Sequence, residues 1–249
     1  MSEIPIPAEL IARLRGARRV AVLTGAGVSA ESGVPTFREA QTGLWARYNP
    51  EDLATPDAFR RDPKLVWEWY AWRRERVRQA EPNPGHRALV ALEQHIAEFS
   101  LITQNVDGLH RRAGSHQLIE LHGNLFRAKC SSEDRPVENW PDGDEIPPRC
   151  PRCGGLLRPD VVWFGEMLPA NALHAAQHAA ASAEIFFSIG TSALVYPAAE
   201  LPMIALAAGA TVVEINPQPT PLSARVTYSL NGPAGAVLPA LIAQAWEAA

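Results

Sequence analysis

Two glycines, Gly25 and Gly27, follow a run of apolar and β-branched residues that ends at Thr24. Because no Cβ stands in the way, such a turn lets backbone N–H groups approach a pyrophosphate, and the helix that follows points its positive end at the same anion. The pattern Gly-x-Gly-x-x-Ala, which closes at Ala30, therefore predicts a strand-to-helix turn that binds a dinucleotide. Taken alone it is a weak signal, since many such turns need glycine for geometry only.

The residues after this turn differ from those of an ordinary nucleotide-dependent dehydrogenase. In such an enzyme a second strand ends in an acidic residue about 20 positions further on. Here residues 32–38 bring a proline, Phe37 and Arg38, and no strand is expected for a long way. One interpretation is a loop that folds over a bound nicotinamide ribose, with Phe37 excluding water and Arg38 near phosphate. The other is a surface turn with a buried phenylalanine.

Polar residues also follow two further apolar runs. The segment Gln104-Asn105-Val106-Asp107 comes after residues 99–103, and His122 comes after residues 118–121. An imidazole with a pKa near 6.5 is a suitable base at neutral pH, although a lone histidine at a strand end is more often structural. Asn105 and Asp107 fit an Asx turn that caps the next helix, a ligand contact, or both. His110 falls on that helix, and we assign it a packing role.

Apolar runs and helical periodicity predict the elements that hold these residues. Strands are expected at residues 19–24, 99–103, 118–121, 184–189 and 211–216, with an extended segment at 161–164 and a short strand near Val226. Helices are expected at residues 8–15, from Thr55-Pro56 onward, and at 63–79, 86–98, 173–183, 198–208 and 237–247. Strands that alternate with helices and are apolar almost throughout predict an α/β fold, a Rossmann-like parallel sheet with helices on both faces. Such sheets bind ligands at the carboxyl ends of their strands.

Residues 130–159 differ in composition from the rest of the chain. They are rich in prolines and acidic residues, lack a long apolar period, and contain all three cysteines. We interpret them as an inserted module that is too small to be stabilised by burial alone. Three clustered cysteines do not form a disulfide framework, and they indicate a metal instead.

The composition narrows the class of protein. The 249 residues are 47% hydrophobic and carry a formal net charge of −4, which is typical of a globular protein and argues against a sequence-independent nucleic-acid binder. No apolar stretch approaches the roughly 18 residues that a membrane span requires, and the N-terminal residues do not resemble a signal peptide. We therefore expect a cytoplasmic protein without a nucleic-acid or membrane partner.

Taken together, these motifs resemble those of the sirtuins, the NAD-dependent protein deacylases. The matching segments are Gly25-Ala26-Gly27-Val28-Ser29-Ala30-Glu31-Ser32-Gly33 with Phe37-Arg38, Gln104-Asn105-Val106-Asp107, His122-Gly123, Phe164-Gly165-Glu166, Gly190-Thr191-Ser192 and Ile215-Asn216-Pro217. They occur in the family's order and span nearly the whole chain. The resemblance implies one catalytic domain over residues 1–249. Its large NAD-binding lobe would comprise residues 1–38, 84–123 and 160–249, and its small lobe would come from the insertions 39–83 and 124–159.

The resemblance also implies a reaction. The acyl oxygen of a modified lysine attacks the ribose carbon of NAD as nicotinamide leaves, and a base then takes a proton from a ribose hydroxyl. By resemblance that base is His122, and the products are nicotinamide, O-acyl-ADP-ribose and free lysine. The implied NAD-binding residues are Gly25, Ala26, Gly27, Ser29, Glu31, Phe37, Arg38, Gln104, Asn105, Asp107, Gly190, Thr191, Ser192, Asn216 and Ala234.

Tyr70 and Arg73 lie three positions apart on one face of the helix expected at residues 63–79. The pair resembles that of the sirtuins that remove succinyl and malonyl groups, since a guanidinium and a phenol can hold the distal carboxylate of an acidic acyl chain. The alternative is a solvent-facing arginine in an arginine-rich helix. By the same resemblance, Phe164 and Gly165 would lie where the substrate peptide adds as a strand.

The cysteine pattern departs from the family. Sirtuins usually hold a structural zinc ion with two Cys-x-x-Cys pairs, whereas here Cys150 and Cys153 form the second pair and Cys130 is followed at the matching position by Glu133. A carboxylate can bind zinc, so Glu133 or Asp134 is a candidate fourth ligand. The sequence leaves open whether the site holds zinc or whether packing alone supports the module.

Two other functions fit the same scaffold. One is a non-catalytic NAD or ADP-ribose binding module, which would have no use for a base at His122. The other is a protein mono-ADP-ribosyltransferase, which would have no use for an acyl-binding pair at Tyr70 and Arg73.

Overall fold

The computed structural model describes residues 4–35, 48–138, 140 and 145–247. Phe37 and Arg38 lie outside these residues. The main sheet contains β1 (Arg19–Thr24), β2 (Glu98–Thr103), β3 (Leu118–Glu120), β7 (Ile185–Ile189), β8 (Thr211–Asn216) and β9 (Tyr228–Asn231) in the order β3-β2-β1-β7-β8-β9. Every neighbouring pair is parallel, as the alternation of strands and helices predicted.

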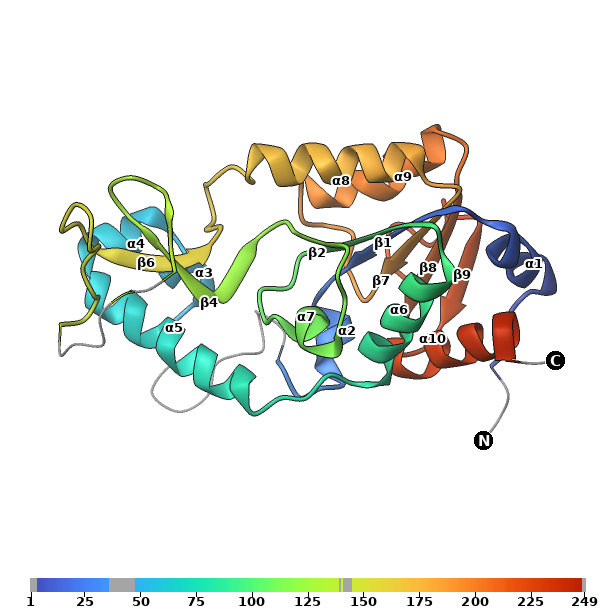
Figure 1. The fold of residues 1–249 in the computed structure, drawn as a ribbon, viewed down its shortest axis with the longest axis horizontal. Coiled ribbons are helices and arrows are strands. Elements are labelled where there is room, and N and C mark those ends of the chain that lie inside the picture. Colours follow the sequence, from blue (N-terminus) through green and yellow to red (C-terminus); the bar gives the residue numbers. More distant parts are fainter. Residues whose placement is uncertain (1–3, 36–47, 139, 141–144, 248–249) are drawn as a thin grey trace.

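Helices cover both faces of this sheet (Figure 1). On one face, α1 (Ala8–Gly16), α6 (Pro84–His95) and α10 (Ala234–Ile242) pack on alternate strand residues such as Val22 and Phe187. On the other face, α8 (Ala170–Ser182) and α9 (Leu201–Ala207) pack on the residues in between, such as Ala21 and Phe186. Successive strand residues point to opposite faces, so a strand between two helical layers is buried on both. The predicted fold class is confirmed.

A second, smaller sheet lies beside the main one (Figure 1). It is antiparallel and contains β4 (Gly123–Cys130), β5 (Pro136–Val137) and β6 (Leu157–Val161) in the order β5-β4-β6. The helices α3 (Pro50–Leu53), α4 (Pro56–Arg61) and α5 (Pro63–Arg78) precede it in the chain, and α5 contributes Trp69 and Tyr70 to a core shared with Leu125 and Trp163. The small sheet and the residues after it thus share a core with α5.

Local signals explain where several helices begin. The Thr55 hydroxyl accepts a hydrogen bond from the Ala58 N–H at the start of α4, as expected from a cap followed by proline. At α6, the Asn83 side chain accepts from the N–H groups of Gly85 and His86, so the helix begins at Pro84 rather than at the predicted residue 86.

Other boundaries also differ from the prediction. Helix α6 ends at His95 rather than at residue 98, and β2 begins at Glu98. The segment predicted as extended through residue 164 is a strand only to Val161, because the chain turns after it. Helix α8 begins at Ala170, the strand predicted near Val226 is β9, and α10 begins at Ala234 and ends in a π-helical turn, Ala243–Glu247. A 3-10 turn, η2 (Ala198–Glu200), precedes α9 where we predicted one helix.

Among the residues that the structure describes, helices that combine membrane-spanning length with sufficient apolar character are absent.

Candidate active site

The carboxyl ends of the parallel strands hold the polar motifs. Strand β1 lies between β2 and β7, and the chain continues from β1 to β2 on one side and later returns to β7 on the other. This is the point at which open α/β sheets form a ligand-binding crevice. The motifs at residues 25–33, 104–107 and 190–192 directly follow these three strands.

The glycine turn after β1 packs against the turn after β7. The N–H of Gly27 donates to the carbonyl of Gly190 at 2.8 Å, and the N–H of Gly25 donates to the carbonyl of Ile189 at 3.0 Å. A Cβ on Gly27 would lie 2.8 Å from both Cα and O of Gly190, which no side chain tolerates without a shift of backbone. These two N–H groups are therefore engaged within the protein. The expectation that backbone N–H groups of this turn approach a pyrophosphate stays a prediction. The glycines permit close packing of two loops.

A buried cluster lies between α2 (Ala26–Ala30) and the turn after β2. The Ser29 hydroxyl donates to Asp107 Oδ2 at 2.7 Å, and the Asn105 side-chain amide donates to Ser29 Oγ at 3.1 Å and to the Gly25 carbonyl at 3.0 Å. Asp107 Oδ1 accepts from the Leu109 N–H, which is the predicted Asx turn at the start of α7 (Leu109–Ala113). Burial raises the pKa of Asp107 above its usual value. The cluster holds the glycine turn against β2.

His122 follows β3 after one intervening residue, Leu121, and its imidazole is partly buried. Its Nδ1 lies 3.0 Å from the backbone carbonyl oxygen of Gln104. Because a carbonyl can only accept, Nδ1 must carry the proton, and the neutral ring then has its lone pair on Nε2. Burial lowers the pKa of His122 below 6.5, so the ring is neutral near pH 7. The arrangement supplies a base that is oriented and unprotonated.

A chain of hydrogen bonds extends from His122 across the sheet edge. The Gln104 side chain donates to Thr191 Oγ1 at 3.1 Å, and the Asn216 side chain donates to the Thr191 carbonyl at 2.9 Å. Gln104, Thr191 and Asn216 follow or end β2, β7 and β8, so residues far apart in sequence converge here. Ser192 is exposed beside them. The sequence placed these residues at strand ends but gave no sign that Thr191 joins the other two.

The Glu31 side chain reaches the start of α10, where Ala234 is the first residue. Glu31 Oε1 accepts from the N–H of Gly235 at 2.8 Å, in the first turn of α10, which begins at the buried Ala234. A carboxylate there is stabilised by the unpaired N–H groups and by the positive end of the helix dipole.

His110 has the packing role that we predicted. It is 2% exposed, and its Nε2 lies 2.9 Å from the Thr24 hydroxyl. Its ring centroid lies 4.8 Å from that of His86, and burial lowers the pKa of His110 to about 3 and that of His86 to about 4. Neither ring therefore takes up a proton near neutral pH in the folded protein.

Tyr70 and Arg73 lie together on α5, but the phenol is internal. Tyr70 is fully buried, and its hydroxyl accepts a hydrogen bond from the Trp163 indole Nε1 at 2.9 Å. The Arg73 guanidinium carbon lies 5.0 Å from the Trp69 ring centroid and 5.5 Å from that of Tyr70. Burial raises the pKa of Tyr70 and lowers that of Arg73. Arg73 is partly buried against two aromatic rings, so the alternative of a solvent-facing arginine is wrong.

Phe164 and Gly165 form an exposed turn after Trp163. Phe164 is 50% exposed, and its N–H donates to the Ala54 carbonyl at 2.9 Å. Gly165 has φ of +86°, a conformation that L side chains rarely adopt. The turn connects the small sheet to the segment before α8.

The cysteines converge with one carboxylate. The ligand atoms of Cys130, Glu133, Cys150 and Cys153 all lie within 4.8 Å of one another, and the two Sγ atoms of Cys130 and Cys153 are 3.4 Å apart. Tetrahedral zinc with Zn–S distances of about 2.3 Å needs ligand atoms about 3.8 Å apart, so this donor set fits the ion. The N–H groups of Arg152 and Cys153 lower the pKa of Cys150 to about 7, which favours the thiolate that a metal requires.

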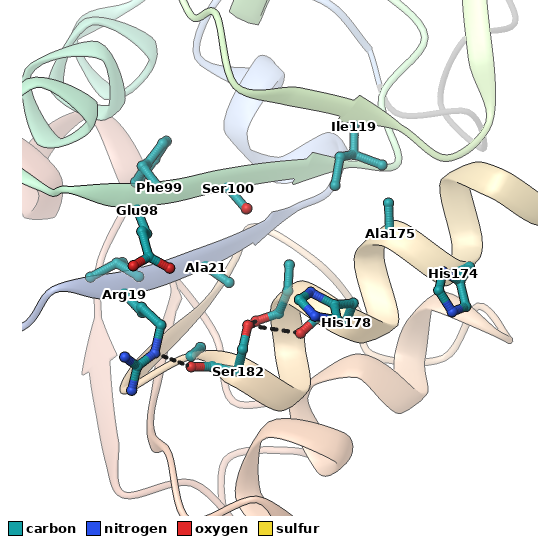
Figure 2. A pocket seen from close by; sticks show the side chains of 13 residues that line it. Arg19, Ala21, Glu98, Phe99, Ser100, Ile119, His174, Ala175, His178 and Ser182 are labelled. Carbon is teal, nitrogen blue, oxygen red and sulfur yellow. Dashed lines mark hydrogen bonds between the residues drawn. The ribbon is translucent and has the colours of Figure 1, made fainter.

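A separate hollow lies at the opposite end of the strands (Figure 2). It has a volume of about 430 Å³ and is lined by the amino ends of β1 and β2, including Arg19 and Glu98, and by His174 and His178 of α8. Figure 2 shows Arg19 donating to the Ser182 carbonyl, a contact of 2.8 Å. The predicted site residues do not line this hollow.

Comparison with known proteins identifies the class. The Sir2 family profile matches residues 25–197. A relative from Methylococcus capsulatus, an NAD-dependent protein deacylase, is 53% identical over 242 residues, which cover 94% of this chain and 95% of that protein. A crystal structure of a Sir2 homologue in complex with NAD aligns with a TM-score of 0.90 and 48% identity over 98% of this chain and 95% of that one. Sir2 bound to an acetylated peptide aligns with a TM-score of 0.83 and 33% identity over 93% and 95%. The chain belongs to the Sir2 family, as the motifs indicated.

The packing of the two glycine turns can be tested by adding one methyl group. We expect Gly27→Ala to lower the free energy of unfolding by about 1–3 kcal/mol, because the new Cβ overlaps the backbone of Gly190. Denaturant unfolding measures the change. Gly16→Ala is the control, since a Cβ on Gly16 at the end of α1 meets nothing within 4 Å. Equal stability of the two variants would contradict the packing requirement.

Proposed function

We propose that this chain is an NAD-dependent protein lysine deacylase in which His122 is the general base. The observation that carries the proposal is the orientation of this imidazole. Gln104 holds Nδ1 through its carbonyl oxygen, and burial keeps the ring neutral, so Nε2 is available to accept a proton. A binding module without turnover would not need such a group.

The strand-end residues are proposed to hold NAD as co-substrate. NAD, when bound, supplies a ribose carbon whose bond to nicotinamide breaks as the acyl oxygen attacks. Gln104, Asn105 and Asp107 are assigned to the nicotinamide ribose, and Thr191, Ser192 and Asn216 to the adenosine half. Gly25, Ala26, Gly27, Ser29, Glu31 and Gly190 would shape the crevice, and Ala234 would contact adenine through its backbone. Support comes from the polar, uncharged donor set that β2, β7 and β8 bring together.

His122 would act after the carbon–nitrogen bond has broken. Its Nε2 takes a proton from a ribose hydroxyl, so that this oxygen can attack the imidate formed with the acyl group. The Gln104 carbonyl stabilises the resulting imidazolium because it accepts from Nδ1. The dry surroundings that lower the pKa of His122 also disfavour competing attack by water.

We also propose a preference for acidic acyl chains such as succinyl and malonyl. Arg73, stacked against Trp69 and Tyr70, would pair with the distal carboxylate, and Phe164 and Gly165 would receive the peptide as an added strand. The relatives are named as protein deacylases without a stated acyl group. The support is that the Arg73 guanidinium lies against two aromatic rings and is partly buried.

We also propose that the chain has two lobes and that the protein is cytoplasmic. Residues 1–38, 84–123 and 160–249 would form the NAD-binding lobe and the two insertions the small lobe, in agreement with the separate parallel and antiparallel sheets. We propose a cytoplasmic protein whose partners are acylated proteins.

We expect the purified protein to release nicotinamide and free lysine from NAD and a succinyl-lysine peptide. His122→Ala should lower turnover about 10²–10⁴-fold, because it removes the base. The rate should also fall as the pH drops through the pKa of His122, which burial places below 6.5, since protonation removes the lone pair on Nε2. Liquid chromatography of the products measures the turnover of the variant and the pH dependence of the wild-type rate. His178→Ala, an exposed change on α8, is the control, and turnover that survives loss of His122 would refute its role.

The acyl preference is tested with Arg73→Met. We expect kcat/KM to fall about 10–100-fold for succinyl and malonyl peptides and to stay within a few-fold for the acetyl peptide, because only the acidic chains form a charge-assisted hydrogen bond. Arg76→Met, at an exposed arginine of the same helix, is the matched control. An equal loss of kcat/KM on all three peptides would mean that Arg73 does not bind the distal carboxylate of the acyl chain.

We propose that Cys130, Cys150, Cys153 and Glu133 hold one structural zinc ion. The purified protein should then contain about one zinc per chain, and Glu133→Gln should release it at a lower chelator concentration, because an amide is a poorer ligand than a carboxylate. Metal analysis and a zinc-responsive dye measure the two quantities. Glu138→Gln, at an exposed residue nearby, should behave as the parent protein. If Glu133→Gln released zinc only at the chelator concentration that the wild-type protein requires, Glu133 would be excluded as a ligand.

A further inference from the structure

The residues around Trp163 form a contact chain that the sequence motifs do not explain. Trp163 is 2% exposed and directly precedes the exposed turn at Phe164 and Gly165. Its indole N–H donates to the Tyr70 hydroxyl on α5, and its backbone N–H donates to Glu166. Glu166 belongs to the Phe164-Gly165-Glu166 motif, but the proposed reaction gives it no role.

Glu166 and Arg158 clamp Trp163, since Glu166 bonds to its backbone N–H and Arg158 lies over its ring. Both carboxylate oxygens of Glu166 accept from the Arg158 guanidinium, at 2.6 and 2.9 Å, and Oε2 also accepts from the Trp163 N–H at 2.8 Å. The Arg158 guanidinium carbon lies 3.3 Å from the Trp163 ring centroid. Arg158 is buried on β6, and its Nη2 also donates to the Val161 carbonyl at 3.0 Å. A paired, buried guanidinium stacked on the indole fixes the plane of the ring.

The fixed indole in turn holds Tyr70. Its Nε1 donates to the Tyr70 hydroxyl at 2.9 Å, and the rings of Tyr70 and Trp163 lie 6.4 Å apart at an interplanar angle of 34°. Tyr70 is fully buried, so a hydroxyl that lost this donor would have to turn toward another partner. The hydroxyl oxygen lies on the axis of the ring, so it comes closer to another donor only if the whole side chain shifts, and that shift would move the ring over which Arg73 lies.

We propose that Trp163, clamped by Glu166 and Arg158, is a positioning residue that selects acidic acyl chains by holding the Tyr70 hydroxyl and, through the Tyr70 ring, the Arg73 guanidinium. The inference rests on the proposed deacylase function and its acyl pocket. It gives Glu166 a role in substrate selection, and it makes the turn that would receive the peptide continuous with the residues that would read the acyl group.

The test compares Trp163→Phe, Tyr70→Phe and the double variant on succinyl and acetyl peptides of one sequence. Trp163→Phe keeps an aromatic ring and removes the N–H donor. We expect its kcat/KM to fall about tenfold for the succinyl peptide and to stay within about twofold for the acetyl peptide. The double variant should match Tyr70→Phe, because the indole acts through the hydroxyl that Tyr70→Phe already lacks. The control is Trp67→Phe. Trp67 is a buried tryptophan of α5, the helix that carries Tyr70, and it packs near Ala128 and Leu157, so this variant should retain the wild-type ratio of succinyl to acetyl activity.

Each other outcome has a distinct meaning. A wild-type protein that removes no acyl group from any peptide refutes the proposed function. A wild-type protein that removes succinyl groups but whose Trp163→Phe variant keeps the succinyl-to-acetyl ratio, or loses both activities equally, overturns this inference alone. A double variant that is additively worse than the two single variants also overturns it, because Trp163 would then act independently of the Tyr70 hydroxyl.

Discussion

The close approach of two glycine turns at the middle of the sheet is the contact on which the candidate site depends. Gly27 meets Gly190 with no room for a Cβ, and Gly190 has φ of +60°, which favours glycine. This contact brings the turn after β1 against the turn after β7, so that α2 faces the residues that follow β2. Ser29 can then bond to Asn105 and Asp107, and Thr191 can bond to Gln104. A larger residue at either turn would separate the strand ends that carry the polar groups.

Burial and pairing together set the chemical state of the site. Polar groups removed from water are costly unless they find partners, and the polar side chains of Ser29, Asn105 and Asp107 have them. The same exclusion of water lowers the pKa of His122 and leaves its Nε2 as the basic atom, because Nδ1 is bonded to a carbonyl. His110 has the same side chain and a similar position in sequence, but its Nε2 is bonded to Thr24 in the interior. Position relative to the strand end therefore separates the candidate base from a packing histidine.

The small lobe has its own organising contact, the clamp of Glu166 and Arg158 on Trp163. It joins β6 to α5 through Tyr70 and so connects two segments that are some 90 positions apart in the chain. Cys130, at the end of β4, belongs to the cysteine cluster whose donor set fits zinc. Local packing, a metal-type cluster and a shared core with α5 replace the large apolar interior that this module lacks.

The sequence by itself determined the strands of the parallel sheet, most of the helices that cover it, the fold class and the family, but not the strands of the small antiparallel sheet. Runs such as residues 20–23 and 212–213 are apolar, and the caps at Thr55 and Asn83 act over three residues, so these features can be read locally. Only the tertiary structure decided what the motif residues contact. It showed that the Gly25 and Gly27 amides serve loop packing, that Thr191 links Gln104 to Asn216, and that Tyr70 is internal and bonded to Trp163. The physical reason is that these partners lie tens of residues apart, so their hydrogen bonds depend on strand order and on which groups burial leaves unpaired, and neither is encoded in a local pattern.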